Sequence, residues 1–339
     1  ERQAMANYLV SIPYPTGPRR SYTNQMSSVA QRGFVLFHIE GDNNPIHEKP
    51  NVCGDCHRLP FYTTTNSTAN GMDTPSWRGA QDLHNFFPQA RINIIDFDTF
   101  RQIAEQGIPE KSLWQLSWSG LQGVRTRFDP VWDMVLEMST GFSGAFARQF
   151  TLNKNSAGER LTNDLVQALE QASDEGAVVL EAEGVFVNAD QTESVELQFA
   201  SGVYRSKTGP KQYTRKELVA LAGQGKFVGT FTARHGINAT IDHAQPAIWD
   251  LNPIESFFVR QAFPEVSKQQ PVIKISGRHL KDDALVIVDG RRVDAKVKVN
   301  DYDQIEITLA KLPSSGRHFL QVQVPEGPIS NDYLFIVKN

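Results

Sequence analysis

Cysteine is almost absent from this chain, which has two among 339 residues. Cys53 and Cys56 lie three positions apart, and neither a second CxxC pair nor an HxxxH pair accompanies them. A structural zinc site usually takes four Cys or His ligands, so the sequence does not favour one. If other chemistry uses both thiols, no disulfide remains, and the parts of the chain must be held together by burial of apolar surface.

Long apolar runs and an excess of positive charge are also absent. The longest apolar run, near Val178, is broken by Glu181 and Glu183, which indicates a strand and not a membrane span. Charged residues make up 21% of the chain and the formal net charge is −4, so no basic patch points to nucleic acid as a partner. The 40% hydrophobic content is ordinary for a globular protein, and the length predicts two or three domains.

What the chain does contain is the motif Cys53-Gly54-Asp55-Cys56-His57. Two thiols at this spacing can bond both vinyl groups of a haem, and the next residue can then bind the iron through its imidazole. A redox or structural thiol pair is the alternative, but a thioredoxin-like pair would follow a strand, whereas this motif follows a Pro- and Asn-containing loop at 42–50. We therefore expect one covalent haem c per chain, bound by Cys53, Cys56 and His57.

The helices expected around this motif resemble those of class I c-type cytochromes. A helix is predicted over 28–38, with Ser27 or Ser28 as its N-cap and with Gly33 and Phe37 four positions apart. In that family, a small residue and an aromatic residue at this spacing let the first and last helices cross. The last helix is predicted from Pro130, after Asp129 as N-cap, and its apolar face is expected to meet the Gly33/Phe37 helix.

This resemblance implies a mainly α haem domain over 25–150, preceded by an N-terminal helix and linker over 1–24. It also implies a periplasmic or extracellular (secreted) location, because bacterial c-type haem is attached outside the cytoplasm. The chain begins at Glu1 without Met or a signal peptide, so we expect a mature form or the C-terminal part of a longer polypeptide.

The stretch from Gly71 to Gly79 resembles the segment that closes over the haem in bacterial di-haem peroxidases and related cytochromes. The resemblance implies Met72 as the sixth iron ligand, with Trp77 and Arg78 facing the haem propionates. Those peroxidases have an aliphatic residue where Trp77 stands and usually Asn where Gly79 stands, so the match is partial. Three histidines remain rival candidates for the sixth ligand: His38, His47 and His84. Met134 and Met138 of the predicted last helix are instead expected to pack in the core.

After residue 150 the pattern changes to a β-rich α+β module over 151–252. Helices are expected at 161–172 and 216–222, and strands at 178–187, 193–199 and 226–234. A Pro-containing linker is expected over 253–270. His235 and His243 are best interpreted as structural histidines, because no carboxylate cluster accompanies them.

Residues 271–339 are expected to form only short strands. The strands are predicted at 272–276, 284–288, 292–299, 304–309, 318–324 and 333–337, with turn residues such as Gly277 and Asp289-Gly290 between them. This segment resembles the IPT/TIG immunoglobulin-like domain, which implies a β-sandwich that serves as a spacer or a binding module. The predicted fold class is therefore multidomain: a mainly α cytochrome c domain, an α+β or mostly-β module, and an all-β immunoglobulin-like sandwich.

These features favour an extracytoplasmic mono-haem cytochrome that transfers single electrons to and from a redox partner protein. Two alternatives stay open. A peroxidase-like haem enzyme would need an open iron position and normally a second haem, and this chain has a single CxxCH motif. A secreted binding or adhesion protein would instead use its β domains to hold a carbohydrate or protein ligand, with the haem as an attached redox group.

Overall fold

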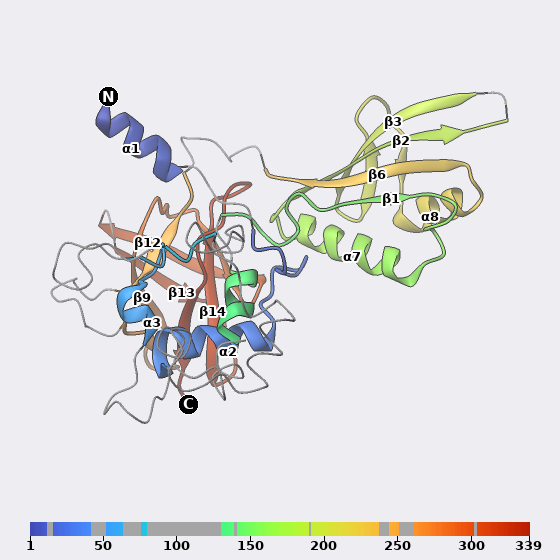
Figure 1. Cartoon of the computed structure of the whole chain (residues 1–339). Coiled ribbons are helices and arrows are strands. Elements are labelled where there is room, and N and C mark those ends of the chain that lie inside the picture. Colours follow the sequence, from blue (N-terminus) through green and yellow to red (C-terminus); the bar gives the residue numbers. More distant parts are fainter. Residues whose placement is uncertain are drawn as a thin grey trace, which may run out of the picture.

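The computed structural model describes residues 1–11, 16–41, 52–63, 76–79, 130–138, 141–189, 191–236, 244–250, 261–301 and 304–339. An N-terminal helical region is followed by a β-rich region that contains three sheets, as the sequence predicts in outline (Figure 1). No helix of the described part is long and apolar enough to span a membrane. Asp129, the predicted loop at 42–50 and residues 253–260 of the predicted linker lie outside the described residues.

The N-terminal helices lie close to their predicted positions, except for the short helix at Cys53–Cys56, which the sequence did not predict. They are α1 (Arg2–Ser11), α2 (Ser28–Val35), the π-helix η1 (Leu36–Glu40), α3 (Cys53–Cys56) and a helical stretch over 130–137. The Ser27 side chain caps α2 by accepting a hydrogen bond from the backbone N–H of Ala30, which confirms the predicted N-cap. The predicted helix over 28–38 continues into η1, where the chain ends its helical path at Gly41 with a φ of 72°.

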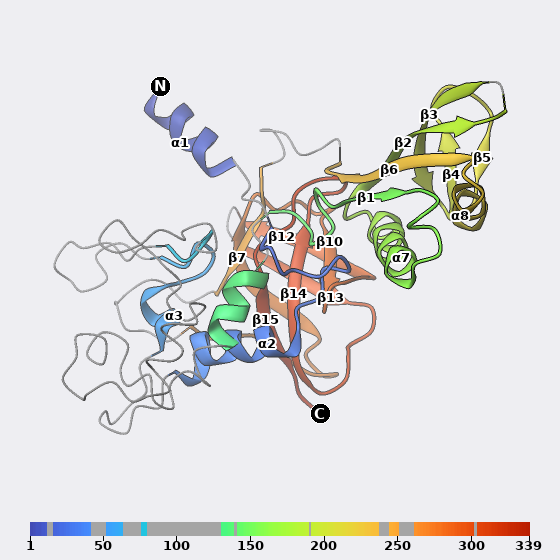
Figure 2. The same ribbon diagram turned by 45° about the vertical axis from the view of Figure 1, so that its right-hand side comes forward.

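Gly33 lets α2 and the helix over 130–137 touch through their backbones, as predicted from the Gly33/Phe37 spacing. A Cβ atom on Gly33 would lie 1.8 Å from the carbonyl oxygen of Pro130 and 2.9 Å from the nitrogen of Val131. The two helices lie side by side in both ribbon views (Figures 1 and 2). The close crossing therefore depends on the missing side chain at this one position.

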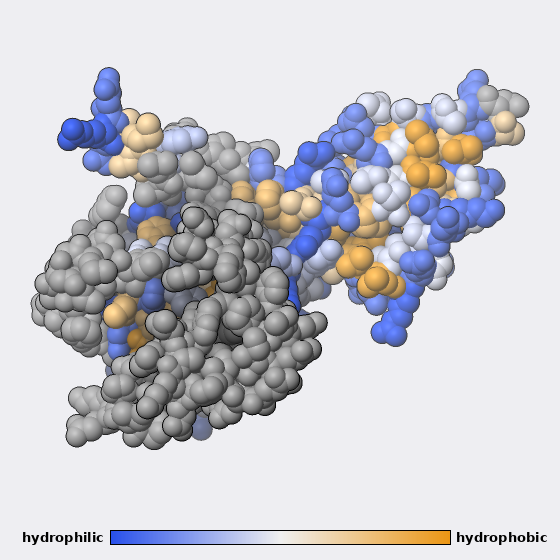
Figure 3. Space-filling model, viewed as in Figure 1, coloured by the Kyte–Doolittle hydropathy of each residue, from blue (hydrophilic) through white to orange (hydrophobic). Residues whose placement is uncertain are grey.

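The middle of the chain forms a separate unit around a six-stranded antiparallel sheet. The sheet order is β1-β6-β2-β3-β4-β5, and α7 and α8 pack against it. The elements are β1 (Gln149–Leu152), α7 (Arg160–Asp174), β2 (Val179–Val187), β3 (Thr192–Ala200), β4 (Val203–Ser206), β5 (Gln212–Tyr213), α8 (Arg215–Gly223) and β6 (Phe227–Arg234). Hydrophobic residues also reach the surface of this unit, among them Val228 and Leu161 (Figure 3).

Two further sheets make up the rest of the β-rich region. One has the order β11-β10-β14-β15-β8 and the other β12-β13-β9-β7. Apolar side chains of both sheets belong to one buried cluster, so the sheets pack against each other. Their strands are β7 (Ala247–Trp249), β8 (Glu265–Val266), β9 (Val272–Arg278), β10 (Leu285–Val288), β11 (Arg291–Val293), β12 (Ala295–Asp301), β13 (Gln304–Leu309), β14 (Gly316–Gln323) and β15 (Tyr333–Val337).

The structure differs from the sequence prediction at two places in these sheets. The strand expected over 292–299 is two strands, because the chain leaves one sheet and enters the other at Asp294. Strand β7 lies just before the predicted linker over 253–270 and pairs with β9, whereas β8 lies within that linker and pairs with β15, so the linker prediction is wrong at 265–266. The strand-forming part of the C-terminal region therefore begins before Pro271.

The helices α2 and η1 and the helix over 130–137 share one hydrophobic core with the two C-terminal sheets, whereas the sequence suggested a haem domain and a sandwich with separate cores. The Phe34 ring of α2 lies 5.2 Å from the ring of Phe319 in β14 and 5.9 Å from that of Phe263, measured between centroids. Val131 and Met134 belong to the same buried cluster. A short helix can bury its apolar stripe only against another layer, and here the sheets provide that layer.

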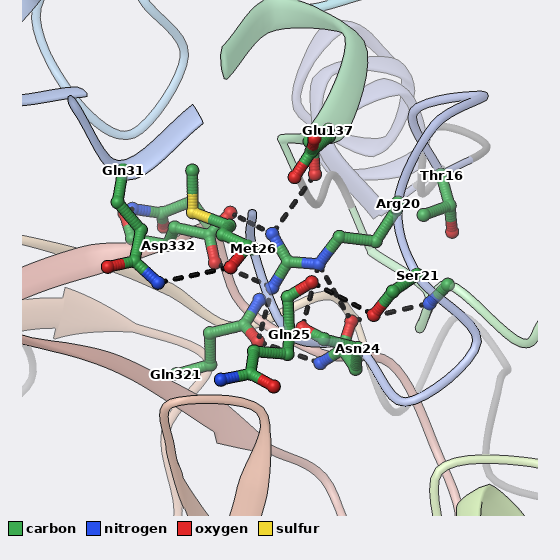
Figure 4. A network of polar contacts seen from close by, with 12 residues as sticks. Thr16, Arg20, Ser21, Asn24, Gln25, Met26, Gln31, Glu137, Gln321 and Asp332 are labelled. Carbon is green, nitrogen blue, oxygen red and sulfur yellow. Dashed lines mark hydrogen bonds and ion pairs between the residues drawn. The ribbon is translucent and has the colours of Figure 1, made fainter. Parts of the chain in front are cut away.

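Residues 16–26 connect the helix over 130–137 to the C-terminal sheets through a buried polar network (Figure 4). Arg20 makes two 2.9 Å contacts to the Asp332 carboxylate, and both side chains are at most 2% exposed. Arg20 also donates to the backbone oxygens of Asn24 and Glu137 and to the side chain of Gln321. Hydrogen bonds therefore satisfy the buried charges on several sides.

Candidate haem-binding site

The helix α3 places the two cysteines of the CxxCH motif one turn apart. Cys53 is exposed and Cys56 is half-buried. Gly54 lies between them, where a Cβ atom would be 2.5 Å from Nδ1 of His38 and 3.1 Å from the carbonyl oxygen of Phe37. Only glycine therefore lets α3 pack this closely on η1.

The imidazole of His57 is held between a backbone carbonyl and an indole. Its Nδ1 lies 3.1 Å from the carbonyl oxygen of Tyr62, and its Nε2 lies 3.2 Å from Nε1 of Trp77. A carbonyl oxygen can only accept and an indole N–H can only donate, so the ring proton belongs on Nδ1 and the lone pair on Nε2. This is the arrangement of a metal-binding histidine, whose second nitrogen donates to a carbonyl.

Tyr62 supplies that carbonyl from an unusual backbone conformation. Its φ is 55°, in the left-handed region, and its side chain is 2% exposed in the core. The same carbonyl oxygen also lies 3.3 Å from the backbone nitrogen of Trp77, which donates to it. The loop after the motif and the segment 76–79 are thus joined at the atom that orients His57.

Trp77 and Arg78, the two residues expected to face the haem propionates, are both described. Their side chains contact different parts of the protein. The Trp77 ring lies 5.5 Å from the His57 ring and 5.3 Å from that of Phe37. Arg78 reaches the β-rich region, where its Nη2 donates to Oε1 of Gln245 at 2.6 Å. Both remain near the motif, Trp77 at Nε2 of His57 and Arg78 over the Phe61 ring of the following loop.

Met72, the predicted sixth ligand, lies outside the described residues, as do His47, His84 and His243. The rival ligand His38 is described and is fully buried among Phe34, Phe37, Tyr62 and Phe263. Burial lowers the pKa of His38 to about 3; the nearby Gln261 amide opposes this effect and the charge of His57 adds to it. Neither ring nitrogen has a hydrogen-bond partner of good geometry among the described residues.

The two methionines of the last helix pack in the core, as predicted. Met134 is 0% exposed and Met138 1% exposed. Neither is therefore a surface residue beside the motif, and their role is to fill the shared core.

The sequence analysis missed several residues that hold the site together: Gly54, Phe61, Tyr62, Gln245, Asp250 and Arg278. The one available signal was the aromatic pair Phe61-Tyr62 inside a loop expected to be polar. The contacts of Gln245, Asp250 and Arg278 with the site join positions more than 160 residues apart, as in the pair Arg78 and Gln245. No local pattern indicates such pairs.

Within the described ranges, no three His, Cys, Asp or Glu side chains form a group that could hold a metal ion by themselves. Comparison of the chain with protein-family models gives no match, and no curated protein matches it. The interpretation of the site therefore rests on the geometry and chemistry of its own residues.

Proposed function

We propose that this protein is a mono-haem c-type cytochrome that transfers single electrons, with the haem attached to Cys53 and Cys56 and the iron bound by His57. The observation that carries the proposal is the state of the His57 ring. Its Nδ1 proton is committed to the Tyr62 carbonyl, so Nε2 presents the lone pair that an iron ligand needs.

The thiols also fit haem attachment better than a redox pair. Burial, followed by the negative charge of Asp55, raises the pKa of the Cys56 thiol. A redox-active CxxC pair instead needs a lowered thiol pKa, because the thiolate is the nucleophile. Addition of each thiol across a haem vinyl group needs no oxidant and leaves a thioether.

A bound haem c would supply an iron that gains or loses one electron. The chain's own part would be to present Nε2 of His57, to exclude water with the Phe37 and Trp77 rings, and to place positive charge nearby through Arg78. Trp77 now donates to the nitrogen that would bind iron, so its indole must give up that hydrogen bond when haem binds. Met72 is the proposed sixth ligand.

We also propose an identity for two parts of the fold. The helical region would be the cytochrome part, and the two C-terminal sheets would be an immunoglobulin-like sandwich that acts as a spacer or binds a partner. Support for the sandwich comes from two sheets with a common core, one antiparallel throughout and the other antiparallel except for β8, which runs parallel to β15. The proposed location is periplasmic or extracellular, and the proposed partner is a redox protein.

The test is to produce the full chain together with a haem-attachment system and to look for haem that survives denaturation. We expect covalent haem in the wild type and none in the Cys53→Ala/Cys56→Ala variant. His57→Ala should disturb the visible spectrum, whereas His235→Ala, at a histidine far along the chain, should not. Wild-type protein without covalent haem would contradict the proposal.

A further inference from the structure

The loop that follows the CxxCH motif is anchored at its first residue to the β-rich region. Nη2 of Arg58 lies 3.5 Å from Oδ2 of Asp250, and both side chains are less than a tenth exposed. Asp250 directly follows β7, and its Oδ2 also accepts a hydrogen bond from the backbone N–H of Ala262 at 3.2 Å. A buried pair of this kind is costly to break, because the remaining charge has no water around it.

A second anchor holds the loop at Phe61. The guanidinium carbons of Arg78 and Arg278 lie 5.2 and 4.7 Å from the centroid of the Phe61 ring. Arg278 is the last residue of β9, and it is paired with Ala247 of β7. Cation–π contacts thus connect the loop to the same sheet edge that carries Asp250.

The two anchors, Arg58 and Phe61, lie in the four residues that precede Tyr62, the residue that orients His57. Tyr62 has a φ of 55°, a conformation that is unfavourable for a residue with a side chain and persists only where its surroundings impose it. The carbonyl of Tyr62 accepts from Nδ1 of His57 as a result of that conformation. The contacts that Arg58 and Phe61 make with the C-terminal sheets are part of the surroundings that hold Tyr62 in this conformation.

We propose that Asp250, acting through Arg58, is a positioning residue for His57. It holds the loop so that the Tyr62 carbonyl accepts the Nδ1 proton, and thereby sets how strongly Nε2 donates to the haem iron. The C-terminal sheet edge thus tunes the iron ligand. This inference rests on the proposed haem function.

The experiment compares Asp250→Asn with the wild type in the full-length, haem-bound protein. In the reduced, low-spin state, NMR can follow the exchange of the His57 Nδ1 proton with solvent. We expect exchange to become faster by about tenfold or more in Asp250→Asn, because a less firmly held loop opens the hydrogen bond from Nδ1 to the Tyr62 carbonyl more often. The midpoint potential should rise, because a less basic imidazole stabilises oxidised iron less well. Asp250→Glu should restore most of both values.

Glu170→Gln is the matched control, since it removes a carboxylate that pairs with Arg215 in the six-stranded unit. It should leave both measurements unchanged. If Asp250→Asn does not fold, Phe61→Ala removes the second anchor and should speed the exchange in the same direction. Attached haem with unchanged exchange and potential in the variants overturns the positioning role and leaves the proposed function intact. Wild-type protein without haem overturns the proposed function itself.

Discussion

Glu170 is a carboxylate that folding removes from water. Tyr204 donates to its Oε1 at 2.9 Å, and Nη1 of Arg215 lies 3.3 Å from its Oε2. Burial raises the pKa of Glu170, and the hydrogen bond from Tyr204 and the charge of Arg215 only partly offset that effect. The folded state therefore holds a proton on this group more tightly than the unfolded state does.

This shift predicts the sign of a pH effect on the six-stranded unit. The stability contributed by protonated Glu170 is fully present below the ordinary carboxyl pKa of 4.5 and is lost as the pH rises through the raised folded-state pKa. Hydrogen exchange of β2 and β6 amides across this pH window should show decreasing protection. Glu170→Gln should flatten the dependence, and a slope of opposite sign in the wild type would contradict the explanation.

Replacement of Met72 tests whether this residue is the sixth ligand of the proposed haem. In Met72→Ala we expect haem to stay attached, because the thioethers at Cys53 and Cys56 do not depend on the sixth ligand. The midpoint potential should fall by on the order of 100 mV, and carbon monoxide should bind to the reduced protein rapidly. Potentiometric titration and ligand-binding kinetics measure both. A variant with the wild-type spectrum and potential would make His38, His47 or His84 the next residue to replace.

At the scale of single residues, the sequence indicated candidate ligand residues more clearly than the residues that hold them in place. The motif itself predicts Cys53, Cys56 and His57, because the spacing of the thiols matches the haem vinyl groups. The Tyr62 carbonyl could not be predicted, since a backbone oxygen carries no residue-type signal and a left-handed tyrosine is rare. The placement of Trp77 against His57 was missed for a similar reason, because it depends on a contact between two separate loops.

At the scale of elements, the crossing of α2 with the helix over 130–137 gives a direct test. In Gly33→Ala the new methyl group would overlap the backbone of Pro130, so we expect a loss of about 1–3 kcal/mol in the free energy of unfolding. Urea denaturation of the full chain measures it. Gly158→Ala is the control, because nothing lies within 4 Å of the added atom. Equal stabilities of the two variants would mean that the helices separate at little cost.

Elements with strong periodicity or clear caps were predictable. The helix expected over 161–172 is α7, in which Val166 is buried and Leu161 is exposed. The short strands β7 and β8 were not predicted. They have three and two residues, too few for an alternating pattern, and they form because distant strands offer them partners.

The six-stranded unit is placed in the chain as an insertion between parts that share a core. Its first strand, β1, and its last, β6, are neighbours in the sheet, with Gln149 opposite Thr232. The chain therefore enters and leaves the unit at nearly the same place, which lets the unit lie between the helix over 130–137 and β7 without separating them. Sequence order alone suggested three consecutive domains, because a local pattern does not show which distant segments share a core.

At the scale of the whole molecule, the pair of Arg20 and Asp332 should be among the most sensitive polar contacts. Arg20→Met leaves the Asp332 charge buried without its partner, so we expect a loss of about 3–5 kcal/mol in the free energy of unfolding. Arg20→Met combined with Asp332→Leu should recover a large part of it. Arg19→Met is the neighbouring control, because its ion pair with Asp133 is exposed and should contribute about 1 kcal/mol or less. Urea denaturation compares all three, and equal losses at both arginines would contradict this view.

The 312 positions between Arg20 and Asp332 also bear on the order in which the protein matures. During synthesis the six-stranded unit emerges with every strand it needs, whereas α2 must wait for β14 and Asp332 before its core can close. The hydrophobic core next to Cys53 and Cys56 would therefore stay incomplete during most of the synthesis of the chain. Under the proposed function, haem attachment would be easiest before β14 and β15 complete the core around α2.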